Sequence, residues 1–252
     1  MKTQLKQELN KYLFPVREDR IFYPNTGGLK TTDEFKSIVR GDTGEIISVM
    51  RDTYKLIPNS VIIESLMEQL DGIDCRYVID KQHSYIDNSK MRLSLILPEL
   101  KFTDPDSPIF LSVMVGNSYD GSESYSRKFF LNRQICSNGM LAKTFLDETS
   151  RKHTSSFETD ELKANLEKSV KKFPFIQYRI EEMLNTKVTK RFREQVDNRL
   201  GKTVSDYLDS VEKRGEDNLY DVYHHLTYWA SHICNTKHQM NYHNEISRLF
   251  NL

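Results

Sequence analysis

Apolar and polar residues alternate along much of the first half of the chain, and this period of two predicts β-strands. Two apolar runs on either side of Gly41 and Gly44 predict a hairpin. Further strands are predicted by CRYVIDKQH (75–83), MRLSLIL (91–97) and IFLSVMVG (109–116). A longer strand over 125–136 follows turn residues that begin at Tyr119.

A period near 3.6 predicts helices elsewhere. Residues 58–72, PNSVIIESLMEQLDG, predict one amphipathic helix, and nearly everything after Ser137 has a helical pattern. The expected helices of the second half are one capped by Ser137 or Asn138 that runs through Leu146, one or two over 159–200 with a break at Pro174, and shorter ones near 204–211, 219–233 and 242–252.

These elements predict an α+β fold, in which an antiparallel β-sheet over 35–136 with packed helices is followed by a helical C-terminal half. The expected divisions are an N-terminal segment (1–34), an α+β sheet core (35–150) and a helical region (151–252) that packs with the core as one domain.

Charge and cysteine content limit the class of protein. The 252 residues carry 36 Lys plus Arg against 36 Asp plus Glu, so any nucleic-acid site must be a local basic patch. The three cysteines (Cys75, Cys136 and Cys234) do not suggest a disulfide framework and fit a reducing compartment. No apolar segment is long enough to span a bilayer and no signal peptide is evident, so we expect a cytoplasmic protein without a membrane partner.

Basic and aromatic residues are interleaved in SYSRKFFLNRQI (124–135), a mixture that suits single-stranded nucleic acid. In this hypothesis Arg127, Lys128 and Arg133 contact phosphates while Tyr125 or Phe130 stacks on a base. A second basic cluster would extend the path through Lys187, Lys190, Arg191 and Arg193. The alternatives are a half-buried strand whose cations face water and a helix whose cations pair with neighbouring acids.

Other candidate sites have weaker patterns. The late histidines and a cysteine invite a metal hypothesis, but their spacing matches no standard motif; they are His224, His225, His232, Cys234, His238 and His243. Asp120 and Glu123 form either an acid–base or cation-binding pair or an ordinary turn. Cys136 could be a thiolate at a helix N-terminus, but no histidine lies at an informative spacing. We expect no cofactor and no resident metal.

Three ordered segments carry a family resemblance: RGDTGEIISVMRDTYKLIPNS (40–60), NSYDGSESYSRKFFLNRQICSNGM (117–140) and NLYDVYHHLTYWASH (218–232). They resemble the phage/plasmid-like protein family, also called domain of unknown function 932. Tyr119 stands where the family commonly has His, and Tyr228–Trp229 replaces a less bulky pair. The resemblance implies a gene of phages, plasmids or other mobile elements, hence a bacterial host cell, and brings no established reaction.

The leading hypothesis is therefore a non-enzymatic nucleic-acid-binding protein that protects or anneals single strands during replication or recombination. The first alternative is a protein-interaction module that acts on a host factor or defence system through Tyr220, Tyr223 and Trp229. The second is a metal-dependent enzyme built on Asp120, Glu123 or the late histidines. Single-stranded nucleic acid is the expected partner, and a host protein and a homo-oligomer stay open.

Overall fold

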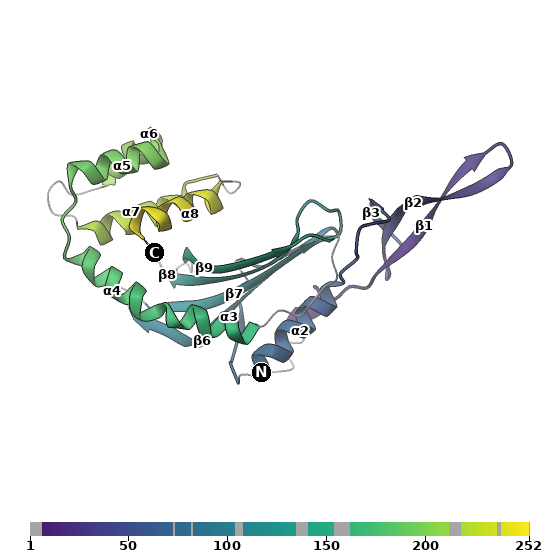
Figure 1. Cartoon of the computed structure of the whole chain (residues 1–252), viewed down its shortest axis with the longest axis horizontal. Helices are drawn as coiled ribbons and strands as arrows, with labels where there is room; N and C mark the ends of the chain where they lie inside the picture. The colour runs from purple at the N-terminus through teal and green to yellow at the C-terminus, as the bar shows by residue number, and fades with distance from the viewer. Residues whose placement is uncertain are drawn as a thin grey trace. The chain divides into compact units, whose positions relative to one another are not determined.

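The computed structural model describes residues 7–72, 74–81, 83–103, 108–134, 141–153, 162–211, 218–235 and 238–251. They form two antiparallel sheets and helices α2 to α8, with the helices concentrated in the second half of the chain (Figure 1). This arrangement confirms the predicted α+β class.

The first sheet has three strands, β1 (Val16–Asn25), β2 (Gly28–Arg40) and β3 (Ile46–Arg51), in the order β1-β2-β3. The hairpin between β2 and β3 confirms the prediction around Gly41 and Gly44. The expected start of the sheet at residue 35 is wrong, because β1 pairs with β2 through the turn at Asn25 and Gly28. Gly28 has φ +115°, a conformation open to glycine, so the residues that seemed to break regular structure make a hairpin turn.

The second sheet has the strand order β4-β6-β7-β8-β9, and β5 also pairs with β6. Its strands are β4 (Val78–Ile79), β5 (Tyr85–Ile86), β6 (Lys90–Thr103), β7 (Pro108–Ser118), β8 (Tyr125–Gln134) and β9 (Leu141–Arg151). Helix α2 (Asn59–Gly72) confirms the amphipathic helix predicted after β3.

The helix expected through Leu146 is wrong, because residues 141–151 form β9. Pairing with β8, the strand before it, satisfies the backbone of this segment, and this sheet context outweighs a local helical pattern. The predicted caps Ser137 and Asn138, and Cys136, lie outside the described residues.

The second half contains α3 (Leu162–Lys171), α4 (Phe173–Leu184), α5 (Lys190–Leu200), α6 (Lys202–Val211), α7 (Leu219–His232) and α8 (Gln239–Phe250). The 159–200 region thus holds three helices rather than one or two. Pro174 lies in the first turn of α4, where its missing N–H costs nothing. Thr189 caps α5 by accepting a hydrogen bond from the Phe192 N–H at 3.2 Å.

The chain forms two compact units. One comprises Met1–Pro98, Val113–Lys128 and Glu148–Leu166, and the other comprises Glu99–Ser112, Phe129–Asp147 and Glu167–Leu252. The first unit has a buried cluster of Phe14, Ile38, Tyr54 and Tyr119. The second unit packs α5 on α6 and α8, and α4 on α7.

Candidate functional site

The polar motif Asn117–Ser122 ties the end of β7 to the start of α2 in the first unit. The buried Asn117 amide donates from Nδ2 to the Ile57 carbonyl at 2.9 Å and to Asn59 Oδ1 at 2.8 Å. The Tyr119 hydroxyl accepts the Asn59 backbone N–H at 2.8 Å, and burial raises the pKa of this tyrosine. The motif therefore holds the scaffold together.

Asp120 and Glu123 serve the turn that follows. Asp120 Oδ1 accepts the Ser122 N–H at 2.9 Å, and Ser118 Oγ donates to the Glu123 carbonyl at 2.8 Å. Burial raises the pKa of Asp120, but the hydrogen bonds from Ser122 and Ser89 and the charge of Lys90 together outweigh this effect and leave it below its usual value. Glu123 Oε1 lies 3.8 Å from Arg92 Nη2. These contacts fit the turn alternative rather than an acid–base pair.

Strand β8 carries the first set of predicted nucleic-acid contacts, and most of it lies inside the sheet between β7 and β9. Tyr125, Arg127 and Phe130 are buried, with exposed fractions of 4%, 3% and 0%. Lys128 is half-buried, and the side chain of Arg133 lies outside the described part of the structure. These three buried side chains therefore do not present a ring or a guanidinium group to a nucleic-acid strand at the surface.

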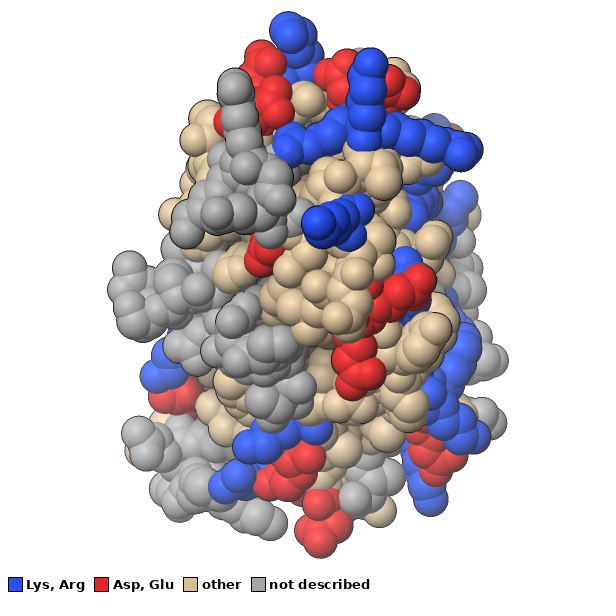
Figure 2. Space-filling model, turned by 90° about the vertical axis from the view of Figure 1, so that its left-hand side faces the viewer, with Lys and Arg blue, Asp and Glu red and all other residues tan. Residues whose placement is uncertain are grey.

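The second predicted set lies at the start of α5 in the second unit. Lys187, Lys190 and Arg191 are exposed, and none of them is ion-paired with another described residue, whereas Arg193 Nη1 lies 2.9 Å from Asp209 Oδ1. Lys190 and Arg191 occupy the first turn of α5, which has no acidic residue. Cations oppose the helix dipole at this end, and an anion would be favoured there. The view in Figure 2 shows basic side chains toward its top, with acidic side chains beside them.

Helix α4 presents two aromatic rings to solvent that the sequence interpretation did not select. Phe175 is 55% and Tyr178 62% exposed, and they are three residues apart, so they share a face. Phe173 and Ile176 are buried on the opposite stripe. Phe175 and Tyr178 fall outside the buried stripe of α4, which the structure defines by Phe173, Ile176, Ile180 and Met183.

The late aromatic and histidine residues lie in the second unit's helical core. Tyr220, Tyr223 and Trp229 are buried, and the Trp229 and Tyr242 ring centroids are 4.8 Å apart. This placement counts against their proposed role as surface anchors for a host protein. Within the described ranges, no group of three His, Cys, Asp or Glu side chains is placed to hold a metal ion.

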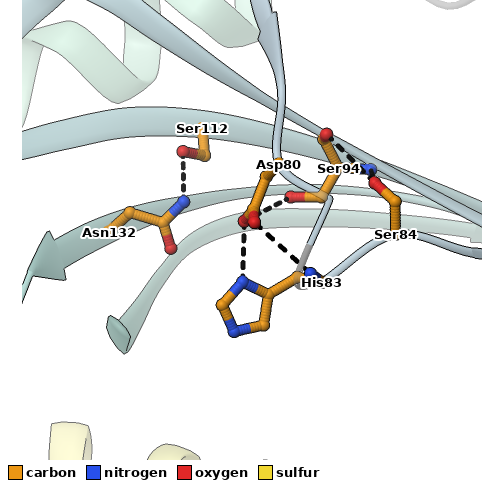
Figure 3. Close-up of polar contacts among 6 residues, drawn as sticks. All are labelled: Asp80, His83, Ser84, Ser94, Ser112 and Asn132. Atoms are coloured by element: carbon orange, nitrogen blue, oxygen red, sulfur yellow. Dashed lines mark hydrogen bonds and ion pairs between the residues drawn. The ribbon is translucent and has the colours of Figure 1, made fainter. Parts of the chain in front are cut away.

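A histidine–carboxylate pair lies after β4 in the first unit (Figure 3). His83 Nδ1 is 2.7 Å from Asp80 Oδ2, and the Ser94 hydroxyl donates to the same oxygen at 3.3 Å. Ser84 Oγ accepts the Ser94 N–H at 2.9 Å, which joins this turn to β6. Asp80 is buried and His83 Nε2 points away from it, an orientation that a general base can use. These hydrogen bonds join the turn after β4 to β6.

Among the described residues, no helix combines the length and the apolar character needed to cross a bilayer. No curated protein and no solved structure matches the chain. One family does match: it covers residues 46–246, which include α2, the Asn117–Ser122 motif and α7. The chain therefore belongs to the family described as Domain of unknown function (DUF932).

Proposed function

We propose that the protein binds single-stranded nucleic acid through an α4–α5 surface, defined by Phe175, Tyr178, Lys187, Lys190 and Arg191. The observation that carries the proposal is that α4 exposes two aromatic rings and that the next helix along the chain, α5, begins with exposed cations. These cations have no ion-pair partner among the described residues. Aromatic faces stack on unpaired bases and cations meet the phosphates between them. Duplex DNA keeps its bases stacked internally, so the rings favour single strands.

The α5 cations keep the phosphate-binding role that the sequence predicted, and the stacking role passes to the rings on α4. Tyr125 and Phe130 are buried in β8, whereas Phe175 and Tyr178 are more than half exposed. Lys171, which precedes α4 by two residues, is also exposed and extends the basic path. Arg193 contributes less, because its guanidinium is already paired with Asp209.

The setting that we propose is the protection or annealing of single strands for a phage, plasmid or other mobile element, in the cytoplasm of its host. The motif resemblance supports this setting, and the overall charge of zero agrees with a local patch rather than a protein that is basic throughout.

The test is fluorescence anisotropy with labelled single-stranded and duplex DNA over a salt series. We expect K187A/K190A/R191A to weaken single-strand binding at least tenfold and to lower the salt slope by roughly 2, since each single-strand phosphate contact contributes about 0.7. F175A/Y178A should weaken binding by a factor of roughly 10 or more with an unchanged slope, because stacking contributes about 1–3 kcal/mol per base.

The matched control removes three exposed cations from the first unit, R51A/K55A/K81A. This variant has the same net charge as the α5 triple variant and should bind within about twofold of the wild type. Equal losses in the two triple variants would show a non-specific charge effect, and an absence of wild-type binding at low salt would reject the proposal.

A further inference from the structure

The edge of the second sheet is interrupted between β4 and β5. Both short strands pair with β6, and residues 80–84 between them lie opposite only residues 93–94 of β6. Irregularities of this kind occur at sheet edges and next to active sites, where they re-aim a side chain. His83 belongs to this interruption.

Side chains fix the interruption to β6. Ser84 Oγ accepts the Ser94 N–H at 2.9 Å and donates to the Ser94 carbonyl at 3.3 Å, as the backbone of a paired strand would. The Asp80 N–H also donates to the Ser94 carbonyl, at 2.9 Å. The turn that carries His83 is therefore held to β6 at both of its ends.

The Asp80 carboxylate orients the His83 ring (Figure 3). Its Oδ2 lies 2.7 Å from His83 Nδ1 and accepts the Ser94 hydroxyl at 3.3 Å. A carboxylate only accepts, so Nδ1 carries the proton and the neutral ring has its lone pair on Nε2, which is directed away from Asp80. The Asp80 side chain is 5% and the His83 side chain 20% exposed, so the ring reaches solvent while the carboxylate is screened from it. A base held in one tautomer by a buried carboxylate is the arrangement of general-base catalysis.

Tyr85 and Arg92 lie on the same face of the sheet edge as this pair. Side chains alternate along β6, so Arg92 shares a face with Ser94, whose hydroxyl contacts Asp80, and Tyr85 lies directly opposite Arg92. Tyr85 is 47% exposed and the Arg92 side chain 45%. Arg92 Nη2 is 3.8 Å from Glu123 Oε1, which is longer than a hydrogen bond, so the guanidinium keeps donors for a phosphate. One face thus presents a base, an aromatic ring and a cation.

We propose that His83 and Asp80 form the general-base pair of a site that cleaves single-stranded RNA. Tyr85 stacks on a base beside the scissile bond, and Arg92 binds the phosphate. The substrate class follows from the chemistry of the base: RNA carries its own nucleophile, the 2′-hydroxyl, so one positioned base can start the reaction, whereas DNA lacks this hydroxyl. The inference rests on the proposed function for its ligand class, but it adds a reaction and lies in the other unit.

The reaction needs only RNA and water. His83 Nε2 takes the proton of the 2′-hydroxyl, the 2′-oxygen forms a bond to phosphorus, and the bond from phosphorus to the 5′-oxygen breaks. The departing 5′-oxygen takes a proton from water, and the imidazolium returns its proton to the hydroxide that remains. Asp80 stabilises the imidazolium, and Arg92 stabilises the charge on the phosphate. The products are a 2′,3′-cyclic phosphate and a free 5′-hydroxyl.

The test incubates the full chain, in excess EDTA, with a labelled oligoribonucleotide, its deoxyribonucleotide counterpart and a deoxy strand that contains one ribonucleotide. We expect cleavage of the RNA, cleavage of the mixed strand only after its ribonucleotide, and an intact DNA strand. Mass spectrometry should find the 2′,3′-cyclic phosphate on the products. Cleavage of the DNA strand, or loss of RNA cleavage in EDTA, would overturn the inference.

His83→Asn separates the base from the turn contact. The asparagine amide can donate to Asp80 in place of Nδ1 but has no counterpart of Nε2, so kcat should fall at least about 100-fold in a chain that stays folded by thermal unfolding. His83→Ala should lose as much activity and regain part of it when free imidazole is added. The control His238→Asn, at an exposed position, should keep the wild-type kcat. Equal cleavage by the wild type and His83→Asn would assign the activity to a contaminating nuclease and overturn the inference.

Asp80→Asn tests the positioning role. Its kcat should fall by a factor of roughly 100 or more while KM stays within about twofold, because an amide favours the wrong tautomer of the ring. Y85A and R92A should each raise KM by a factor of roughly 5 or more. Their controls, Y23A and R51A, remove exposed residues of the same types from the same unit and should keep the wild-type KM. An unchanged KM in both Y85A and R92A would remove the substrate site.

Other outcomes separate this inference from the α4–α5 proposal. If single strands bind but RNA is not cleaved, only this inference fails. If cleavage depends on His83 while K187A/K190A/R191A binds like the wild type, only the α4–α5 proposal fails. If single strands are neither bound nor cleaved, both proposals fail.

Discussion

Asn117 Nδ2 lies 2.8 Å from Asn59 Oδ1, and this buried contact joins β7 to the first turn of α2 across 58 positions of sequence. The same amide donates to the Ile57 carbonyl at 2.9 Å. One side chain therefore fixes both the helix start and the residue that leads into it. The position of α2 in the first unit depends on this amide.

Asn117→Ala should lower the free energy of unfolding by about 2 kcal/mol, because it leaves two buried acceptors without their donor. Urea unfolding measures the change. The control Asn198→Ala, at an exposed position of α5, should stay within about 0.5 kcal/mol of the wild type. Equal midpoints for the two variants would show that the Asn117 amide does not anchor α2.

Tyr119→Phe should cost roughly 1–2 kcal/mol, because the Asn59 N–H loses the hydroxyl oxygen that accepts it at 2.8 Å. Tyr23→Phe removes an exposed hydroxyl and should change the unfolding free energy by less than about 0.5 kcal/mol. Asn117 and Tyr119 both bind Asn59, so the double variant should lose less than the sum of the single losses. Strict additivity would mean that the two residues act independently.

The buried ring of His153 should make stability depend on pH. It stacks on Tyr54 with a centroid distance of 4.9 Å, and burial lowers its pKa despite partly offsetting hydrogen bonds to the backbone of Lys55 and Glu123. The unfolded chain gains a proton near pH 6.5 while the folded chain gains it only at lower pH. The free energy of unfolding should therefore fall as pH drops below about 6.5.

His153→Phe keeps an aromatic ring beside Tyr54 and removes the titrating group, so its unfolding free energy should vary less between pH 5 and 7 than that of the wild type. Urea unfolding at several pH values gives this slope. His238→Phe, at an exposed position, should retain the wild-type slope. A His153→Phe profile parallel to the wild type would assign the pH dependence to other groups.

Local sequence patterns predicted the elements that are specified by residues close together in the chain. The stripe Ile63, Leu66 and Leu70 and the stop at Gly72 were enough for α2, and the glycines at 41 and 44 were enough for the β2–β3 turn. Strand β9 was missed because the spacing of Leu141, Phe145 and Leu146 also fits a helix, and the pairing with β8 decides between the two. Strand β1 was missed because its polar, two-sided pattern is that of an exposed ribbon.

The residues of the candidate site also fall into those that the sequence could predict and those that it could not. The α5 cations could be predicted, since a basic run on a helix face is usually exposed. The burial of Arg127 could not, because it depends on what covers both faces of β8 rather than on the alternation within the strand. Phe175 and Tyr178 could be separated from core aromatics only after the buried stripe of α4 was known.

Gly121, in the turn after β7, should tolerate substitution poorly. Its φ is +70°, and an added Cβ would lie 2.7 Å from Met50 Cε. Gly44 has a similar φ of +74° with no atom within 4 Å, so it provides the matched case of backbone strain without a contact. A left-handed conformation costs a residue with a Cβ roughly 1–2 kcal/mol.

Gly44→Ala and Gly121→Ala should both lower the free energy of unfolding by about this amount. Gly27→Ala, which has no neighbour within 4 Å of its Cβ and no positive φ, should stay near the wild-type value. Met50 Cε is the end of a flexible side chain, so the excess cost at Gly121 should be under about 1 kcal/mol. That excess should disappear in a Met50→Ala background, and its persistence there would place the strain in the turn backbone rather than in the contact with β3.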